Sequence, residues 1–119
     1  MAIENTLLIN LASLGADIED GLMRFSGNET LYVKLLKKFP AAAKAADAAT
    51  AMEARDFDVA VKHAHTLKGV TGNLSLTPLY EAYSELVDAL RAGRTAKAAD
   101  IMAEFAPLQE KFIAVIETD

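Results

Sequence analysis

The sequence predicts an all-α fold, an antiparallel up-down-up-down four-helix bundle with short extra N-terminal helices. Apolar residues recur three and four positions apart along most of the 119 residues, and no segment alternates with the period of two that is typical of a strand. Alanine is abundant and proline occurs only three times, which favours helix throughout. Short turns between four amphipathic segments favour antiparallel neighbours.

Two short helices are expected ahead of the bundle. The first spans residues 4–13 and ends near Gly15, because glycine commonly terminates helices. The second follows Asp17, whose side chain can cap the free backbone N–H groups of a first turn, and it ends at Gly27.

The first long helix is expected to begin after Asn28, another residue that favours N-caps. Pro40 lies inside its apolar line and should kink it, because proline removes a backbone donor and crowds the preceding turn. The alanine-rich run 41–51 reads as plain helix, since a flexible linker would be rich in glycine and serine.

Two further helices, which follow the Asp56-capped helix in the sequence, complete the predicted bundle. Thr77 reads as the N-cap of the first, with Pro78 at its first helical position, where the missing donor of proline costs nothing. Thr95 reads as the N-cap of the last helix. Pro107 is expected either to bend that helix or to mark a helix end at Ala106.

The helix between Asp56 and about Leu74 carries the candidate functional residues. Its apolar stripe faces a core and consists of Phe57, Ala60, Ala64, Leu67, Thr71 and Leu74. On a helical wheel His65 falls on the opposite, solvent-facing side. The residues that share this side with it are Lys62, Lys68, Gly69 and Gly72, with Val61 at the margin. An imidazole, two ammonium groups and two glycines on one exposed surface indicate a site.

The run His65-Thr66-Leu67-Lys68-Gly69 resembles the His-x-x-Lys-Gly signature of the histidine phosphotransfer (HPt) domain, the phosphocarrier of multistep two-component phosphorelays. The resemblance extends over about residues 15–115 of the predicted single domain 1–119. One departure is Ser75, which stands where many members have glycine.

The resemblance implies a phosphocarrier that accepts a phosphoryl group from a receiver-domain aspartate and passes it to another through His65. A neutral imidazole nitrogen is a suitable nucleophile, and at neutral pH much of an ordinary histidine is unprotonated. The ammonium of Lys68 is expected to stabilise phosphoryl oxygens as a point charge. The partners would be response-regulator receiver domains or a hybrid sensor histidine kinase. No cofactor is expected on this chain, and Mg²⁺ would belong to the receiver.

The other residues on this surface are expected to contact the partner. Mid-helix glycine is unfavourable, so Gly69 is explained by clearance for an incoming receiver or else by close helix packing. Gly72 also points outward or simply eases the turn, and Lys62 is most simply a solvated lysine. His63 falls at the edge of the apolar stripe, and a metal site shared with His65 is improbable, because residues two apart on a helix diverge.

Composition narrows the classes of function. The net charge is −5 and no basic stripe is present, so nucleic acid is not expected as a partner. The apolar run 7–9 lacks the positive start of a signal peptide and is too short to span a bilayer. The absence of cysteine is compatible with a reducing cytoplasm, and a cytoplasmic location is expected. The protein is also expected to be a monomer.

Two other classes of function were weighed against the phosphocarrier. One is a docking or scaffold module of the same fold that does not transfer phosphate, and the intact His65, Lys68 and Gly69 argue against it. The other is a small helical enzyme, which lacks a second catalytic residue beside either histidine. Without a glycine-rich phosphate loop or acids to hold Mg²⁺, no ATP-dependent kinase activity is expected.

Overall fold

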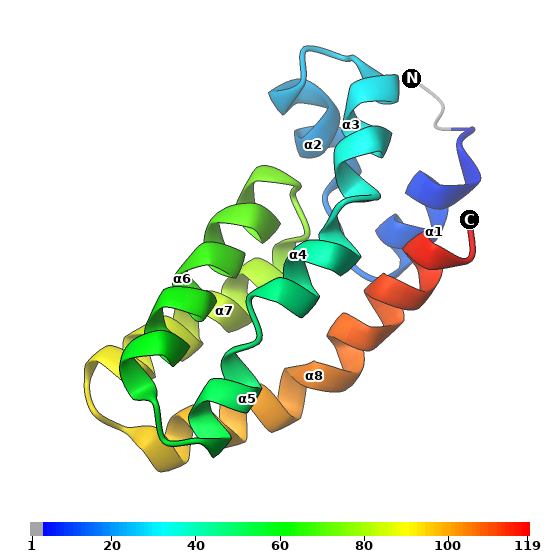
Figure 1. Cartoon of the computed structure of the whole chain (residues 1–119). Helices are drawn as coiled ribbons and strands as arrows, with labels where there is room; N and C mark the ends of the chain where they lie inside the picture. Colours follow the sequence, from blue (N-terminus) through cyan, green and yellow to red (C-terminus); the bar gives the residue numbers. More distant parts are fainter. Residues whose placement is uncertain (1–3) are drawn as a thin grey trace.

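The computed structural model describes residues 4–119, and every regular element in that range is an α-helix. The predicted all-α class is therefore confirmed (Figure 1). The eight helices of the described range are α1 Thr6–Ser13, α2 Ile18–Arg24, α3 Glu29–Leu36, α4 Phe39–Ala45, α5 Ala48–Glu53, α6 Phe57–Asn73, α7 Thr77–Arg91 and α8 Thr95–Glu117. Residues 1–3, which the predicted domain includes, lie outside the described residues.

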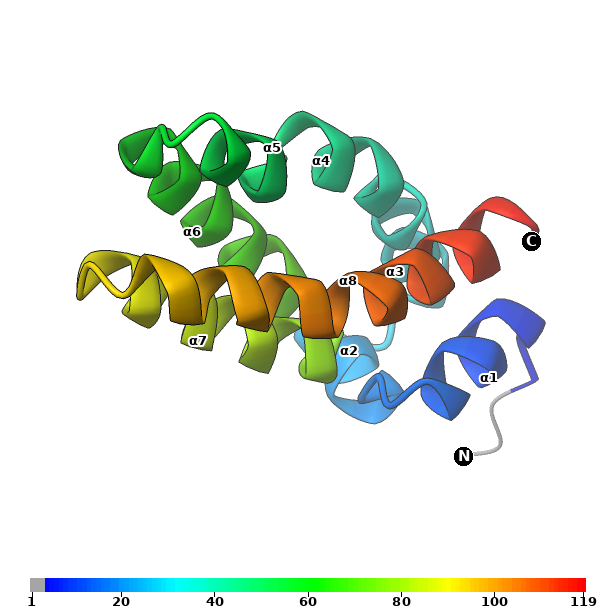
Figure 2. The same cartoon turned by 90° about the horizontal axis from the view of Figure 1, so that it is seen from below.

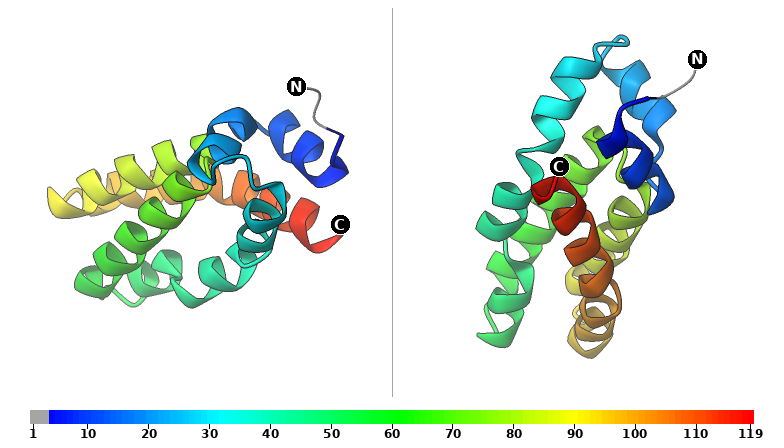
Figure 3. Two further views of the ribbon diagram at one scale, coloured as in Figure 1. Left: turned by 90° about the horizontal axis from the view of Figure 1, so that it is seen from above. Right: turned by 90° about the vertical axis from the view of Figure 1, so that its right-hand side faces the viewer.

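The three longest helices, α6, α7 and α8, form the main body of the molecule. Helix α7 packs against both α6 and α8, and α5 packs against α6 (Figure 2). The segment α3–α4–α5 runs as a broken column along the face opposite α7 (Figure 1). Helix α1 lies beside the last turns of α8 (Figure 3). No helix in the described part of the chain is long and apolar enough to cross a membrane.

The predicted long helix after Asn28 is divided into three. Its first break falls at residues 37–38, ahead of Pro40, which lies in the first turn of α4, where its missing N–H leaves no bond unmade. The second break contradicts the plain-helix prediction for residues 41–51. Asp47 accepts hydrogen bonds from the backbone N–H and the hydroxyl of Thr50, which starts α5 as a new helix.

Three predicted N-caps are confirmed and two are wrong. The side chains of Asp17, Asn28 and Asp56 each accept a hydrogen bond from the backbone N–H three residues later. Thr77 and Thr95 are instead the first helical residues of α7 and α8, which begin without a side-chain cap.

Helix α8 continues through Pro107 to Glu117, so no helix ends at Ala106. The surrounding apolar side chains explain this, because Phe105 and Phe112 on either side of the proline are buried in one core. Tertiary packing thus outweighs the single backbone bond that proline removes.

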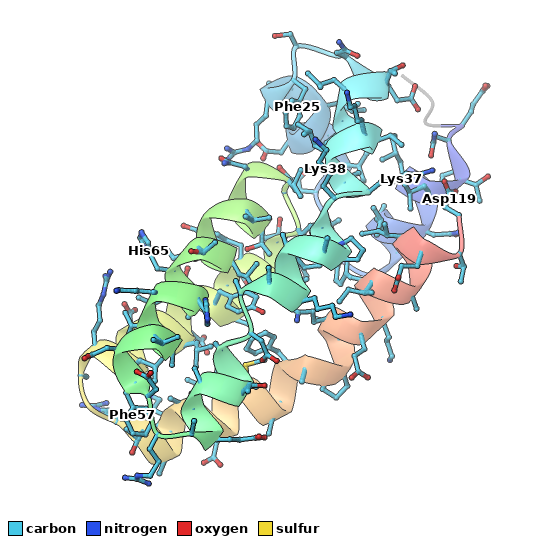
Figure 4. All side chains as sticks on the ribbon, in the orientation of Figure 1. Phe25, Lys37, Lys38, Phe57, His65 and Asp119 are labelled. Atoms are coloured by element: carbon cyan, nitrogen blue, oxygen red, sulfur yellow. The ribbon has the colours of Figure 1, made fainter. Side chains whose placement is uncertain are left out.

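The core is continuous from α1 to α8, and its largest fully buried side chains are Tyr32, Phe39, Tyr83 and Phe112. Both buried tyrosine hydroxyls are bonded: Tyr32 donates to the carbonyl of Leu74 at 2.7 Å, and Tyr83 donates to the side chain of Gln109. Burial raises the pKa of both phenols. Lys37, after α3, pairs with Asp119 at 3.1 Å and so links the column to the chain end (Figure 4).

Candidate functional site

Helix α6 holds the candidate residues, and its buried stripe is as predicted except at Phe57. Ala60, Ala64, Leu67 and Thr71 are buried along one side of α6, and Leu74 is buried directly after its end. Phe57 is only half-buried, with the guanidinium of Arg55 5.5 Å from its ring centroid. This stripe fixes the rotation of the helix and therefore decides which side chains face solvent.

The two histidines of α6 differ in exposure. His65 is exposed and projects from the outer side of α6, away from α4, α5 and α8 (Figure 4). His63 is half-buried, in line with its position at the edge of the apolar stripe. Only His65 therefore offers an imidazole that a second protein can approach freely.

His65 lines an open depression of about 460 Å³, which we call the His65 depression. Its walls come from three helices, and its charged and aromatic members are His65 and Lys68 of α6, Asp20 and Arg24 of α2, and Tyr80 of α7. Gly69 and Gly72 also line it, whereas Val61 and Lys62 do not. Lys62 is exposed and Val61 is half-buried, so both lie beside the depression on α6.

The two glycines of α6 have different surroundings. A Cβ atom added at Gly69 would meet no atom of the described residues within 4 Å, so close packing within this chain does not explain it. A Cβ at Gly72 would lie 2.9 Å from the ring of Tyr80. Gly72 therefore lines the depression as Gly69 does but does not face open space, because the aromatic ring of α7 lies where its side chain would be.

Helix α2 contributes two residues that the sequence did not single out. Arg24 donates from Nε to Oδ2 of Asp20 at 2.7 Å, one turn away on the same exposed helix face. The i, i+4 spacing of opposite charges is visible in the sequence and predicts such a pair. Its position beside His65 is not visible there, because residues 20 and 65 are distant along the chain.

Ser75 connects α2 to the turn after α6. It has a φ of 55°, a conformation that glycine adopts most easily, and its side chain is buried. Its hydroxyl donates to Oδ2 of Asp20 at 2.6 Å, and its carbonyl accepts from the backbone N–H of Asp17 at 2.9 Å. The hydroxyl of Ser75, and next the guanidinium of Arg24, hold the pKa of Asp20 below its ordinary value.

A second link fixes α2 over the end of α6. Gly21 is buried, and a Cβ there would overlap the hydroxyl and ring of Tyr32. The missing side chain lets the Tyr32 hydroxyl reach Leu74, and the ring of Phe25 stacks on Tyr32 with centroids 5.4 Å apart. The wall that α2 provides to the His65 depression is therefore held by buried contacts.

The chemistry of this surface is that of a nucleophile with cations nearby. Within residues 4–119 no group of three or more histidine, cysteine or acidic side chains is arranged to hold a metal ion. The ionic groups at the depression are Lys68, Arg24 and Asp20, so it carries more positive than negative charge although the chain as a whole is at −5. Such a surface suits an anionic group presented by a partner.

Comparison with known proteins gives one match. The family model of the Hpt domain matches residues 31–117, which is most of the chain and includes α6 with His65. Neither the curated proteins nor the solved structures gave a match. Hpt domains are phosphocarriers in phosphorelays, and they interact with receiver domains and histidine kinases. The chain therefore belongs to the Hpt domain family.

Proposed function

We propose that this protein carries a phosphoryl group between the aspartates of two receiver domains, with His65 as the phosphoacceptor. The observation that carries the proposal is the exposed imidazole of His65 one turn from Gly69, where the missing side chain leaves the approach open. A reacting partner has to bring its aspartate within bonding distance of the imidazole, and that requires a clear surface.

The reaction uses one nitrogen of the imidazole. Its lone pair attacks the phosphorus of the aspartyl phosphate, a phosphorus–nitrogen bond forms, and the bond from phosphorus to the aspartate oxygen breaks. The electron pair leaves on the carboxylate. Passing the group onward is the reverse reaction, in which the carboxylate of the second receiver attacks.

The residues around His65 assist the transfer by supplying positive charge and by contacting the receiver. Lys68 follows His65 by three residues on the same helix and supplies a positive charge to the phosphoryl oxygens. The receiver contacts a surface formed by Gly69, Val61 and Lys62. Gly72 contributes to this surface by leaving room for the ring of Tyr80. Mg²⁺ and the remaining catalytic groups are supplied by the receiver.

A transfer assay tests the proposal. Receiver domains from the source genome, charged with radiolabelled acetyl phosphate and Mg²⁺, are mixed with the wild-type protein and with two folded variants. We expect His65→Gln to take no label and His63→Gln to take it, and the label to be lost in acid and kept in base, as a phosphoramidate should be. Loss of labelling in a folded His63→Gln variant together with retention in His65→Gln would contradict the assignment.

The same assay separates the phosphocarrier from a docking module. A scaffold of the same fold would bind a charged receiver and take no label from it. Binding without labelling by every receiver tested would therefore replace the proposed function by that alternative.

A further inference from the structure

Helix α2 lies outside the part of the chain that matches the family model, which begins at residue 31. It nevertheless supplies Asp20 and Arg24 to the wall of the His65 depression. Arg24 also lines a second hollow of about 530 Å³, which we call the Phe25 groove and which includes Phe25, Lys38 and Val70. Phe25 and Lys38 lie at the α2–α3 end of the molecule (Figure 4). Arg24 therefore stands at the boundary between the reactive histidine and an apolar groove.

One hydrogen bond orients the side chain of Arg24. Its Nε donates to Oδ2 of Asp20 at 2.7 Å, and the same oxygen accepts from the hydroxyl of Ser75 at 2.6 Å. The Arg24 and Asp20 side chains are 50% and 45% exposed, and an ion pair that exposed contributes little to stability. Orientation of the guanidinium is a better explanation for the pair than stability.

The terminal nitrogens of Arg24 are left for another molecule. Within the described residues, the hydrogen bond and the ion pair of its side chain are both made by Nε. A guanidinium presents donors in a planar fork that matches carboxylate and phosphate oxygens. Because the fork is already oriented, little conformational entropy is lost when a partner binds it.

We propose that Arg24 is a docking residue for the receiver domain and determines in part which receivers exchange phosphate with His65. This inference rests on the proposed function of His65. The charge of the surface supports the choice of partner, since an aspartyl phosphate is anionic and Arg24 and Lys68 place positive charge at the His65 depression although the net charge of the chain is −5. Ser75 acts through Asp20 as a positioning residue for Arg24.

The test measures transfer from the same set of charged receiver domains at increasing receiver concentration. With the preferred receivers, Arg24→Ala should raise the half-saturating concentration about tenfold and leave the maximal rate near that of the wild type. The difference between preferred and poor receivers should shrink. Arg91→Ala is the matched control, because it removes the same charge at the far end of α7 and should behave as the wild type.

Phosphoramidate, a small donor that needs no docking, separates docking from chemistry. It phosphorylates a histidine with loss of ammonia, so the phosphorus–nitrogen bond to the imidazole replaces the one to ammonia. Arg24→Ala should take label from it as fast as the wild type. Equal slowing with phosphoramidate and with receivers would mean that Arg24 acts on the imidazole or its phosphoryl group, and the docking role would be overturned.

A double-mutant cycle tests the positioning role of Ser75. Ser75→Ala should raise the half-saturating concentration by less than Arg24→Ala does, and it should have no further effect in the Arg24→Ala background. A structural role of Ser75 would lower transfer equally in both backgrounds and would remove Ser75 from the inference.

The proposed function of His65 and the docking role of Arg24 would fail with different experimental results. If the wild type takes no label from any receiver, the proposed function fails and this inference falls with it. If the wild type is labelled and Arg24→Ala matches both the wild type and Arg91→Ala with every receiver, the proposed function stands and Arg24 is not a docking residue.

Discussion

Gly69 and Gly21 are both helical glycines near the same depression, and their surroundings are opposite. At Gly69 on α6 a side chain would enter open space, whereas at Gly21 on α2 it would overlap the buried Tyr32. One glycine leaves room that this chain does not use. The other leaves room that this chain fills, since the Tyr32 hydroxyl passes it to reach Leu74.

Two helical glycines that look alike in the sequence can therefore be present for different reasons. Mid-helix glycine costs about 0.5–1 kcal/mol relative to alanine, so each position needs a compensating benefit. At Gly21 the benefit is packing within the protein, and substitution should lower stability. At Gly69 we propose that the benefit is clearance for the receiver, in which case substitution should lower transfer while leaving the fold intact.

Among the glycine substitutions, the largest expected effect is that of Gly69→Leu on transfer. Leucine is the better helix former, so the melting temperature should stay the same or rise slightly. Its side chain would stand next to His65 and hold the receiver away, and a displacement of about 1 Å can reduce the rate on the order of 100-fold. Thermal melting and the transfer assay on one variant test both halves. A markedly lower melting temperature with normal transfer per folded molecule would refute the clearance explanation.

Gly21→Ala should show the opposite pattern. The new methyl group overlaps a fully buried tyrosine, so overpacking should cost roughly 1–3 kcal/mol and lower the melting temperature by several degrees. Gly69→Ala is the control, because the same change in open space should stabilise the helix by about 0.5–1 kcal/mol. Equal effects at the two positions would remove the distinction between them.

Gly72 should fall between the two extremes. A methyl group there meets the ring of Tyr80 at 2.9 Å, but Tyr80 is 39% exposed, so its ring can move. We expect the gain in helix propensity and the displacement of the ring to offset each other to within about 1 kcal/mol in chemical denaturation. In a Tyr80→Ala background the full stabilisation by alanine should emerge. If it does not, Tyr80 is not what opposes a side chain at position 72.

The smallest effect concerns pH and the exposed pair on α2. Ser75 and Arg24 lower the pKa of folded Asp20 below its ordinary value of 3.8, so its ionised form adds stability that is present above that value. This stability is lost as the pH falls through the pKa that Asp20 has in the folded protein. Comparison of wild type and Asp20→Asn by denaturation at pH 6 and at pH 3 should show a smaller difference at pH 3. A difference that grows in acid would contradict the sign.

Local sequence predicted what depends on a few neighbouring residues. The caps at Asp17, Asn28 and Asp56 follow from one side chain reaching an N–H three residues away, and each is present. Asp47 offers the same geometry inside the alanine-rich run, where alanine propensity misled the prediction. The caps assigned to Thr77 and Thr95 failed because each helix starts one residue earlier than a threonine N-cap would require.

The sequence by itself determined the helical class and the rotation of α6, and hence that His65 faces solvent while Ala64 and Leu67 are buried. Both follow from the period of the helix, which is a property of the backbone. Only the tertiary structure decided that α2 lies beside His65 and that Tyr80 fills the space at Gly72. Those contacts join residues far apart in sequence, and they depend on how buried side chains such as Tyr32 fit together, which no local pattern encodes.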